Sequence, residues 1–113
     1  MQTLLPPVDV TALDGEIGTW LHDTMHDGLA TGVDGWLDDD LAFLADWGFE
    51  PPAVEVPTLV VAGGQDLMVP VSHGHWLADR LPGDADVQDD EGHLSLLRGI
   101  DRVQGWLAER AAR

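Results

Sequence analysis

The stretch that decides the fold is Val56–Pro70, which reads V-P-T-L-V-V-A-G-G-Q-D-L-M-V-P. It contains the unbroken apolar run Leu59–Ala62, rich in β-branched residues, which predicts a strand buried on both faces in a parallel sheet. Gly63 and Gly64 then let the backbone turn sharply before the carboxylate of Asp66. In open α/β sheets, the groups that do chemistry lie beyond the carboxyl ends of the strands, and this spacing places Asp66 there.

A histidine occupies the matching position after the next predicted strand, Ala85–Gln88. The segment D-E-G-H-L-S-L, Asp90–Leu96, presents His93 just before a long periodic segment that predicts a closing helix over Leu94–Ala111. An acid and a histidine past consecutive strands indicate two members of a catalytic triad, in which the acid orients the imidazole and the imidazole acts as the base. The alternative interpretations are a turn aspartate that satisfies backbone amides and a loop histidine that caps the last helix.

The remaining segments are predicted to be mostly helical. Apolar residues recur at helical spacing over Ala12–Ala30 and again over Val33–Ala45, which predicts two amphipathic helices. Between the two strands, Ser72 is a good N-cap for a helix that runs to about Leu81. Met1–Thr11 has two adjacent prolines and no usable periodicity, so we expect a loose lead-in.

Taken together, these elements resemble the C-terminal part of the α/β-hydrolase superfamily. The order is strand, G-G-Q-D-x-x-V-P, helix, P-G turn, strand, E-G-H and closing amphipathic helix, and the resemblance covers about residues 33–107. It implies that Asp66 is the triad acid, which in this family follows the seventh strand. It also implies that His93 is the triad base, which follows the eighth strand.

The preceding string G-V-D-G-W-L-D-D-D-L-A-F-L-A-D-W-G-F, residues 32–49, resembles the end of the lid that many of these enzymes insert before the seventh strand. The implied fold class is α/β, a C-terminal fragment with two parallel strands, flanking helices and an N-terminal helical lid segment. Residues 1–50 are then the lid remnant and residues 51–113 the end of the core. The alternative is a helical hairpin that only packs on the strand.

The family's nucleophile is missing from the sequence. It normally sits on a G-x-S-x-G elbow, and no such string occurs among the 113 residues. The only serines, Ser72 and Ser95, stand at predicted helix starts, where capping is the simpler role. We therefore expect half of a site for ester or amide hydrolysis, inactive alone, which takes a small-molecule acyl substrate when an N-terminal half supplies the nucleophile.

Two further expectations accompany this one. Trp20, Trp36 and Trp47 are candidates for the lid side of an apolar substrate pocket, or else pack between helix and core. The alternative function is a non-catalytic remnant or interaction module that pairs with another chain, or with itself, through an exposed strand edge.

Composition and short motifs limit the partners, location and cofactors that we expect. The formal net charge of −16, with no lysine, argues against nucleic acid and anionic membranes as partners. No apolar run approaches a membrane span and no signal segment opens the chain, so a cytoplasmic location is expected. His22 and His26 have the spacing of a zinc-protease helix, but no third ligand is indicated and we expect neither a metal nor a cofactor.

Overall fold

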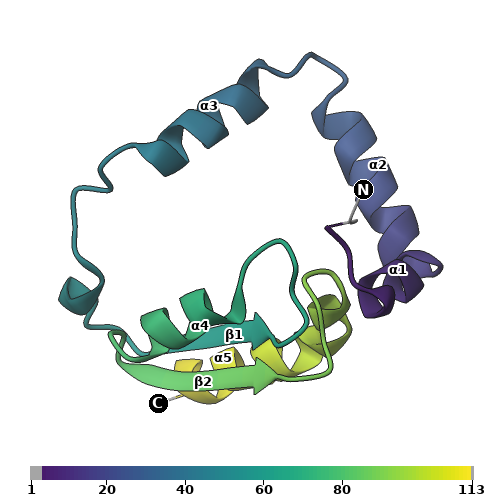
Figure 1. The fold of residues 1–113 in the computed structure, drawn as a ribbon. Coiled ribbons are helices and arrows are strands. Elements are labelled where there is room, and N and C mark those ends of the chain that lie inside the picture. Colours follow the sequence, from purple (N-terminus) through teal and green to yellow (C-terminus); the bar gives the residue numbers. More distant parts are fainter. Residues whose placement is uncertain (1–3, 113) are drawn as a thin grey trace.

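The computed structural model describes residues 4–112 of the chain. Figure 1 shows the elements, which in order are α1 (Pro7–Leu13), α2 (Glu16–Gly28), α3 (Asp34–Leu44), the short 3₁₀ helix η1 (Pro51–Ala53), β1 (Thr58–Gly63), α4 (Val71–Ala78), β2 (Gly83–Gln88), the 3₁₀ helix η2 (Ser95–Gly99) and α5 (Ile100–Ala111). The described residues therefore form a mixed α/β structure, which confirms the predicted class.

The sheet consists of β1 and β2, paired in parallel with Thr58 opposite Gly83 and Gly63 opposite Gln88. Helix α4 is the crossover between them. The two strands therefore end at the same rim, which brings together the Asp66 loop (residues 64–70) and the His93 loop (residues 89–94). Both strands were predicted, but the expected burial of β1 on both faces is wrong. Only Gly63 of β1 is buried, because one partner strand and short helices cover it only in part.

Helices α4 and α5 lie on opposite faces of the strand pair (Figure 1). On one face, Gly74 of α4 approaches β1 so closely that a Cβ atom there would lie 2.6 Å from Cβ of Ala62. On the other face, Asp84 of β2 accepts a hydrogen bond of 2.7 Å from Nε1 of Trp106 in α5. Successive side chains of a strand point to opposite faces of the sheet. Val87, the partner of Ala62, is an odd number of residues from Asp84 in β2, so Ala62 and Asp84 lie on opposite faces.

The helices before the sheet differ from the prediction in two places. The predicted helix Ala12–Ala30 is broken into α1 and α2, because Gly15 takes an extended conformation with φ −124° and ψ −155°. A Cβ atom at Gly18 would clash with the backbone of Leu13, so the break lets the two helices cross closely. The loose lead-in is also wrong from Pro7 onward, where α1 begins; residues 1–3 of that segment lie outside the described residues.

The later helices follow the prediction more closely. Helix α3 matches the predicted second helix. Helix α4 begins one residue before Ser72, with Pro70 as its N-cap and no side-chain cap bond, so the capping role predicted for Ser72 is wrong. The closing helix is present, but its first turn is the 3₁₀ helix η2.

Burial is distributed unevenly along the chain. Apart from Pro6, Ala12 is the only apolar side chain buried in the described part of the chain. Helices α2 and α3 have no buried residue, and every residue from 30 to 50 is exposed. In Figure 1 this arm, residues 15–50, arcs away from the sheet and returns to it at η1. Among the described helices, none combines the length and apolarity that crossing a membrane requires.

Candidate functional site

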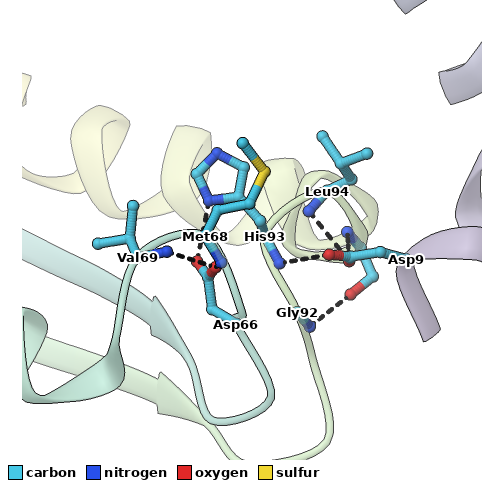
Figure 2. Close-up of polar contacts among 8 residues, drawn as sticks. Asp9, Asp66, Met68, Val69, Gly92, His93 and Leu94 are labelled. Carbon is cyan, nitrogen blue, oxygen red and sulfur yellow. Dashed lines mark hydrogen bonds and ion pairs between the residues drawn. The ribbon is translucent and has the colours of Figure 1, made fainter. Parts of the chain in front are cut away.

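The structure brings the two predicted triad residues together at the rim of the sheet. Oδ2 of Asp66 lies 2.9 Å from Nδ1 of His93, although the residues are 27 positions apart (Figure 2). The side chain of Asp66 is 6% exposed and that of His93 is 39% exposed. A largely buried carboxylate therefore meets one nitrogen of an imidazole that stays open to solvent.

The other carboxylate oxygen of Asp66 is occupied by its own loop. Oδ1 accepts hydrogen bonds of 2.8 Å from the backbone N–H groups of Met68 and Val69 (Figure 2). The interpretation of Asp66 as a turn aspartate is thus correct at one oxygen, while the second oxygen faces the histidine. These two bonds fix the orientation of the carboxylate independently of its contact with the imidazole, so the pair has a defined geometry.

These contacts also set the protonation of Asp66. Removal from water would raise the pKa of its carboxyl group. The hydrogen bonds from Val69, His93 and Met68, with the nearby imidazole charge, outweigh this and hold the pKa below the ordinary value of 3.8. Asp66 is therefore ionised at neutral pH and able to accept from an Nδ1–H group.

The two loops meet because glycines at the end of β1 allow close contact. A Cβ atom at Gly63 would lie 2.5 Å from the carbonyl oxygen of Glu91, and one at Gly64 would lie 2.7 Å from Cα of Asp89. The backbone N–H of Gln65 donates to the carbonyl of Glu91 over 2.9 Å. The G-G sequence thus brings the Asp66 loop against the His93 loop.

A cavity of about 220 Å³ adjoins the pair. Its wall includes Val60 and Val61 of β1, Leu77 of α4, and both Asp66 and His93. With Nδ1 directed at Asp66, the second ring nitrogen of His93, Nε2, lies on the side of the ring away from the carboxylate (Figure 2). The pair therefore borders a largely apolar cavity, and Nε2 is the ring nitrogen that does not face Asp66.

The three candidate tryptophans lie in three separate hollows. Trp47 lines one of about 410 Å³ together with Trp76, and this hollow shares His73 and Leu77 with the cavity at His93. Trp20 lies in a hollow with Leu97 and Ile100. Trp36 lies in another, with residues of α2 and the turn that follows it. Of the three, only Trp47 lines a hollow that shares wall residues with the cavity at the Asp66–His93 pair.

Neither serine is placed to act as a nucleophile. Ser95 is fully buried, and its Oγ accepts a hydrogen bond of 2.8 Å from the N–H of Gly92. Ser72 is exposed on α4, and no hydrogen bond joins it to His93 in the described part of the chain. The other histidine motif remains apart as well: His22 and His26 are exposed on α2, and residues 4–112 contain no group of three side chains arranged to hold a metal.

Sequence reasoning missed one residue of the site, Asp9. It lies on α1, in the segment predicted to be loose, and its carboxylate accepts hydrogen bonds from the backbone of His93 and its two successors. Proline at the start of α1, with an acid in the first turn, is a signal for a short helix. No sequence signal indicates a contact across 84 residues.

Comparison of the chain with protein-family models, with curated proteins and with solved structures found no significant match.

Proposed function

We propose that this chain supplies the acid and the base of an α/β-hydrolase type active site for ester or amide hydrolysis. The observation that carries the proposal is the contact of 2.9 Å between Asp66 Oδ2 and His93 Nδ1. A triad needs an acid that accepts from Nδ1 and leaves Nε2 free to face the nucleophile, and this pair has that arrangement. The sequence resemblance supports the same assignment independently, through the G-G-Q-D and E-G-H motifs.

In the proposed reaction, Nε2 of His93 removes the proton from a hydroxyl nucleophile as that oxygen attacks the acyl carbon. Asp66 stabilises the imidazolium that forms, without taking its proton. The imidazolium then donates the proton to the departing alcohol or amine, and the acyl group stays on the nucleophile. Water, activated by the same imidazole, hydrolyses that acyl intermediate and regenerates the free nucleophile.

The nucleophile comes from a segment outside these residues, in the same or another protein chain. Strand β1 has a strand partner on only one side in the described sheet, and its residues Val60 and Val61 line the cavity at His93. A further parallel strand along that edge would bring its own C-terminal loop to the same rim.

The hollow beside Trp47 fits the apolar part of a substrate in this proposal. Its wall combines Trp47, Phe49 and Trp76 with Leu77, which also borders the cavity at His93. The wall also includes His73 and the carboxylate of Glu50, so it favours an aromatic or branched acyl chain over an anionic one.

The test is complementation. The full chain is mixed with an N-terminal α/β-hydrolase fragment that carries the G-x-S-x-G elbow and ends before the lid, and p-nitrophenyl butyrate is the substrate. We expect hydrolysis only in the mixture, with kcat lowered about 10⁶-fold by His93→Ala. His22→Ala, at an exposed histidine of the arm, is the matched control. A co-eluting complex without activity, or activity that survives His93→Ala, contradicts the proposal.

A second candidate function is strand-edge pairing without catalysis. The six residues of β1 present an edge that no strand of the described sheet covers, and such edges pair with other chains. This function predicts association that depends on concentration and is lost when Val61→Pro removes an edge N–H group, measured by size-exclusion chromatography with light scattering. A monomer at all concentrations would contradict it.

A further inference from the structure

The carboxylate of Asp9 lies in the most thoroughly buried part of the described structure. Its side chain is 0% exposed, although it belongs to a short helix near the start of the chain. Oδ2 accepts from the N–H of His93 over 2.8 Å, and Oδ1 accepts from Leu94 over 3.0 Å and from Ser95 over 2.8 Å (Figure 2). We call this carboxylate with its three donors the Asp9 clasp.

The buried residues of the described structure gather around this clasp rather than in an apolar core. They are Pro6, Asp9, Ala12, Gly63, Gly92 and Ser95. A buried carboxylate is stable only when hydrogen bonds replace its lost hydration, and here three backbone donors do so. The point where α1 meets the His93 loop is therefore the tightest junction in the described chain, and it is polar.

The loop is shaped to fit this carboxylate. A Cβ atom at Gly92 would lie 2.5 Å from Oδ1 and 2.6 Å from Oδ2 of Asp9, so only glycine leaves room for it. The N–H of Gly92 donates to Oγ of Ser95, which closes the loop on itself. The close approach of Asp9, a residue far away in the sequence, thus explains why the middle residue of the E-G-H motif is glycine.

We propose that Asp9 is a positioning residue for the base His93. The imidazole ring of His93 is held by Asp66, and its backbone N–H is held by Asp9. Two of the three donors follow directly after His93, so the carboxylate fixes the direction in which the chain leaves the histidine. With its backbone fixed in this way, His93 places Nδ1 of its ring 2.9 Å from Oδ2 of Asp66.

The effect on turnover rests on the proposed function, whereas the effect on the imidazole does not. Loss of the clasp leaves up to three consecutive N–H groups without an acceptor, one of them buried and two part-buried, so the His93 loop moves to expose them to water. That movement displaces Nε2, and a displacement of about 1 Å costs about 10²-fold in rate. Because α1 continues into the arm, the clasp also links the expected lid segment to the base.

The test compares Asp9→Asn with Asp14→Asn, which removes the same charge at an exposed position at the end of α1. The asparagine keeps the size of the side chain but presents an NH₂ group to one of the three donors. Two readouts use the chain alone: the Nδ1–H signal of His93 in ¹⁵N NMR, and hydrogen exchange of the amides of His93, Leu94 and Ser95. A third readout is the kcat and KM of the complemented hydrolase.

With Asp9→Asn we expect the Nδ1–H signal to be lost and the three amides to exchange at least about 10-fold faster, while the β1 signals stay unchanged. In the complemented hydrolase, kcat falls about 10²-fold and KM changes less than twofold. Asp14→Asn changes none of these quantities. If the wild-type mixture is inactive while the NMR effects appear, the proposed function fails and the positioning role stands.

An unchanged Nδ1–H signal in a folded Asp9→Asn chain overturns the proposal. If Asp9→Asn does not fold, Gly92→Ala decides, because its Cβ atom displaces the carboxylate and leaves the charge in place. A folded Gly92→Ala chain that loses the Nδ1–H signal supports positioning. A folded chain that keeps the signal, or failure of both variants to fold, shows that Asp9 serves the fold alone and overturns the proposal.

Discussion

The molecule contains two kinds of histidine–aspartate pair, one at the rim of the sheet and one on the arm. At the rim, Nδ1 of His93 lies 2.9 Å from Asp66, with side chains 39% and 6% exposed. On the arm, Nδ1 of His22 lies 3.1 Å from Asp23, with side chains 78% and 70% exposed. The distances are similar, so distance alone does not distinguish a candidate triad from a surface contact.

What differs is the anchoring of each partner. Asp66 is held by two backbone N–H groups and His93 by the Asp9 clasp, whereas His22 and Asp23 are neighbours in sequence on an exposed helix. An exposed pair is screened by water and must be ordered at the cost of side-chain entropy, so it contributes little. The rim pair is held in place by residues from three separate parts of the chain.

The largest expected difference between the pairs is in turnover. In the complemented hydrolase, Asp66→Asn should lower kcat about 10⁴-fold, because an amide at this position favours the wrong imidazole tautomer. The comparison variant Asp23→Asn, which alters the arm pair, should leave kcat unchanged. Steady-state kinetics with p-nitrophenyl butyrate measure both, and equal effects of the two variants would remove the distinction between rim and arm.

A smaller difference is expected between the amide hydrogen-exchange rates of the arm and of the sheet. Helix α3 has no buried residue, so its amides open locally, whereas alternate amides of β1 face β2 and are hydrogen-bonded in the sheet. We expect the α3 amides to exchange at least about 10-fold faster than the β1 amides that face β2. This ratio corresponds to a difference of about 1.4 kcal/mol in opening free energy. NMR-detected exchange on the intact chain measures this. Equal protection of α3 and β1 would mean that the arm packs against something in solution.

The smallest effect concerns the pH dependence of stability. The pKa of Asp66 is lower in the folded chain than the ordinary value of 3.8, so its ionised form stabilises the fold. That contribution is fully present above about pH 5 and is lost as the pH falls through the depressed pKa. The difference in unfolding free energy between wild type and Asp66→Asn should therefore shrink below pH 3.8.

Urea unfolding at a series of pH values measures this difference. Asp39→Asn, at an exposed residue of α3, controls for the loss of one negative charge. A gap between wild type and Asp66→Asn that stays constant down to pH 2 would contradict the lowered pKa.

Local patterns in the sequence predicted much of the fold. The β-branched run at Leu59–Ala62 and the segment at Ala85–Gln88 are strands, and they pair in parallel as expected. The break at Gly15 was missed, because the apolar spacing continues across it and only the close crossing at Gly18 shows why the helix ends. Full burial of β1 was overestimated, because a sequence shows that a strand is apolar but not how many neighbours cover it.

By itself, the sequence determined the order of strand, acid, strand and histidine, and parallel pairing then places Asp66 and His93 at one rim. Only the tertiary structure decided that Asp9 holds the backbone of His93 and that the hollow at Trp47, unlike those at Trp20 and Trp36, shares wall residues with the cavity at His93. The reason is physical. Strands and turns follow from residues close together in the chain, whereas a carboxylate that accepts from amides 84 residues away depends on packing that no local pattern encodes.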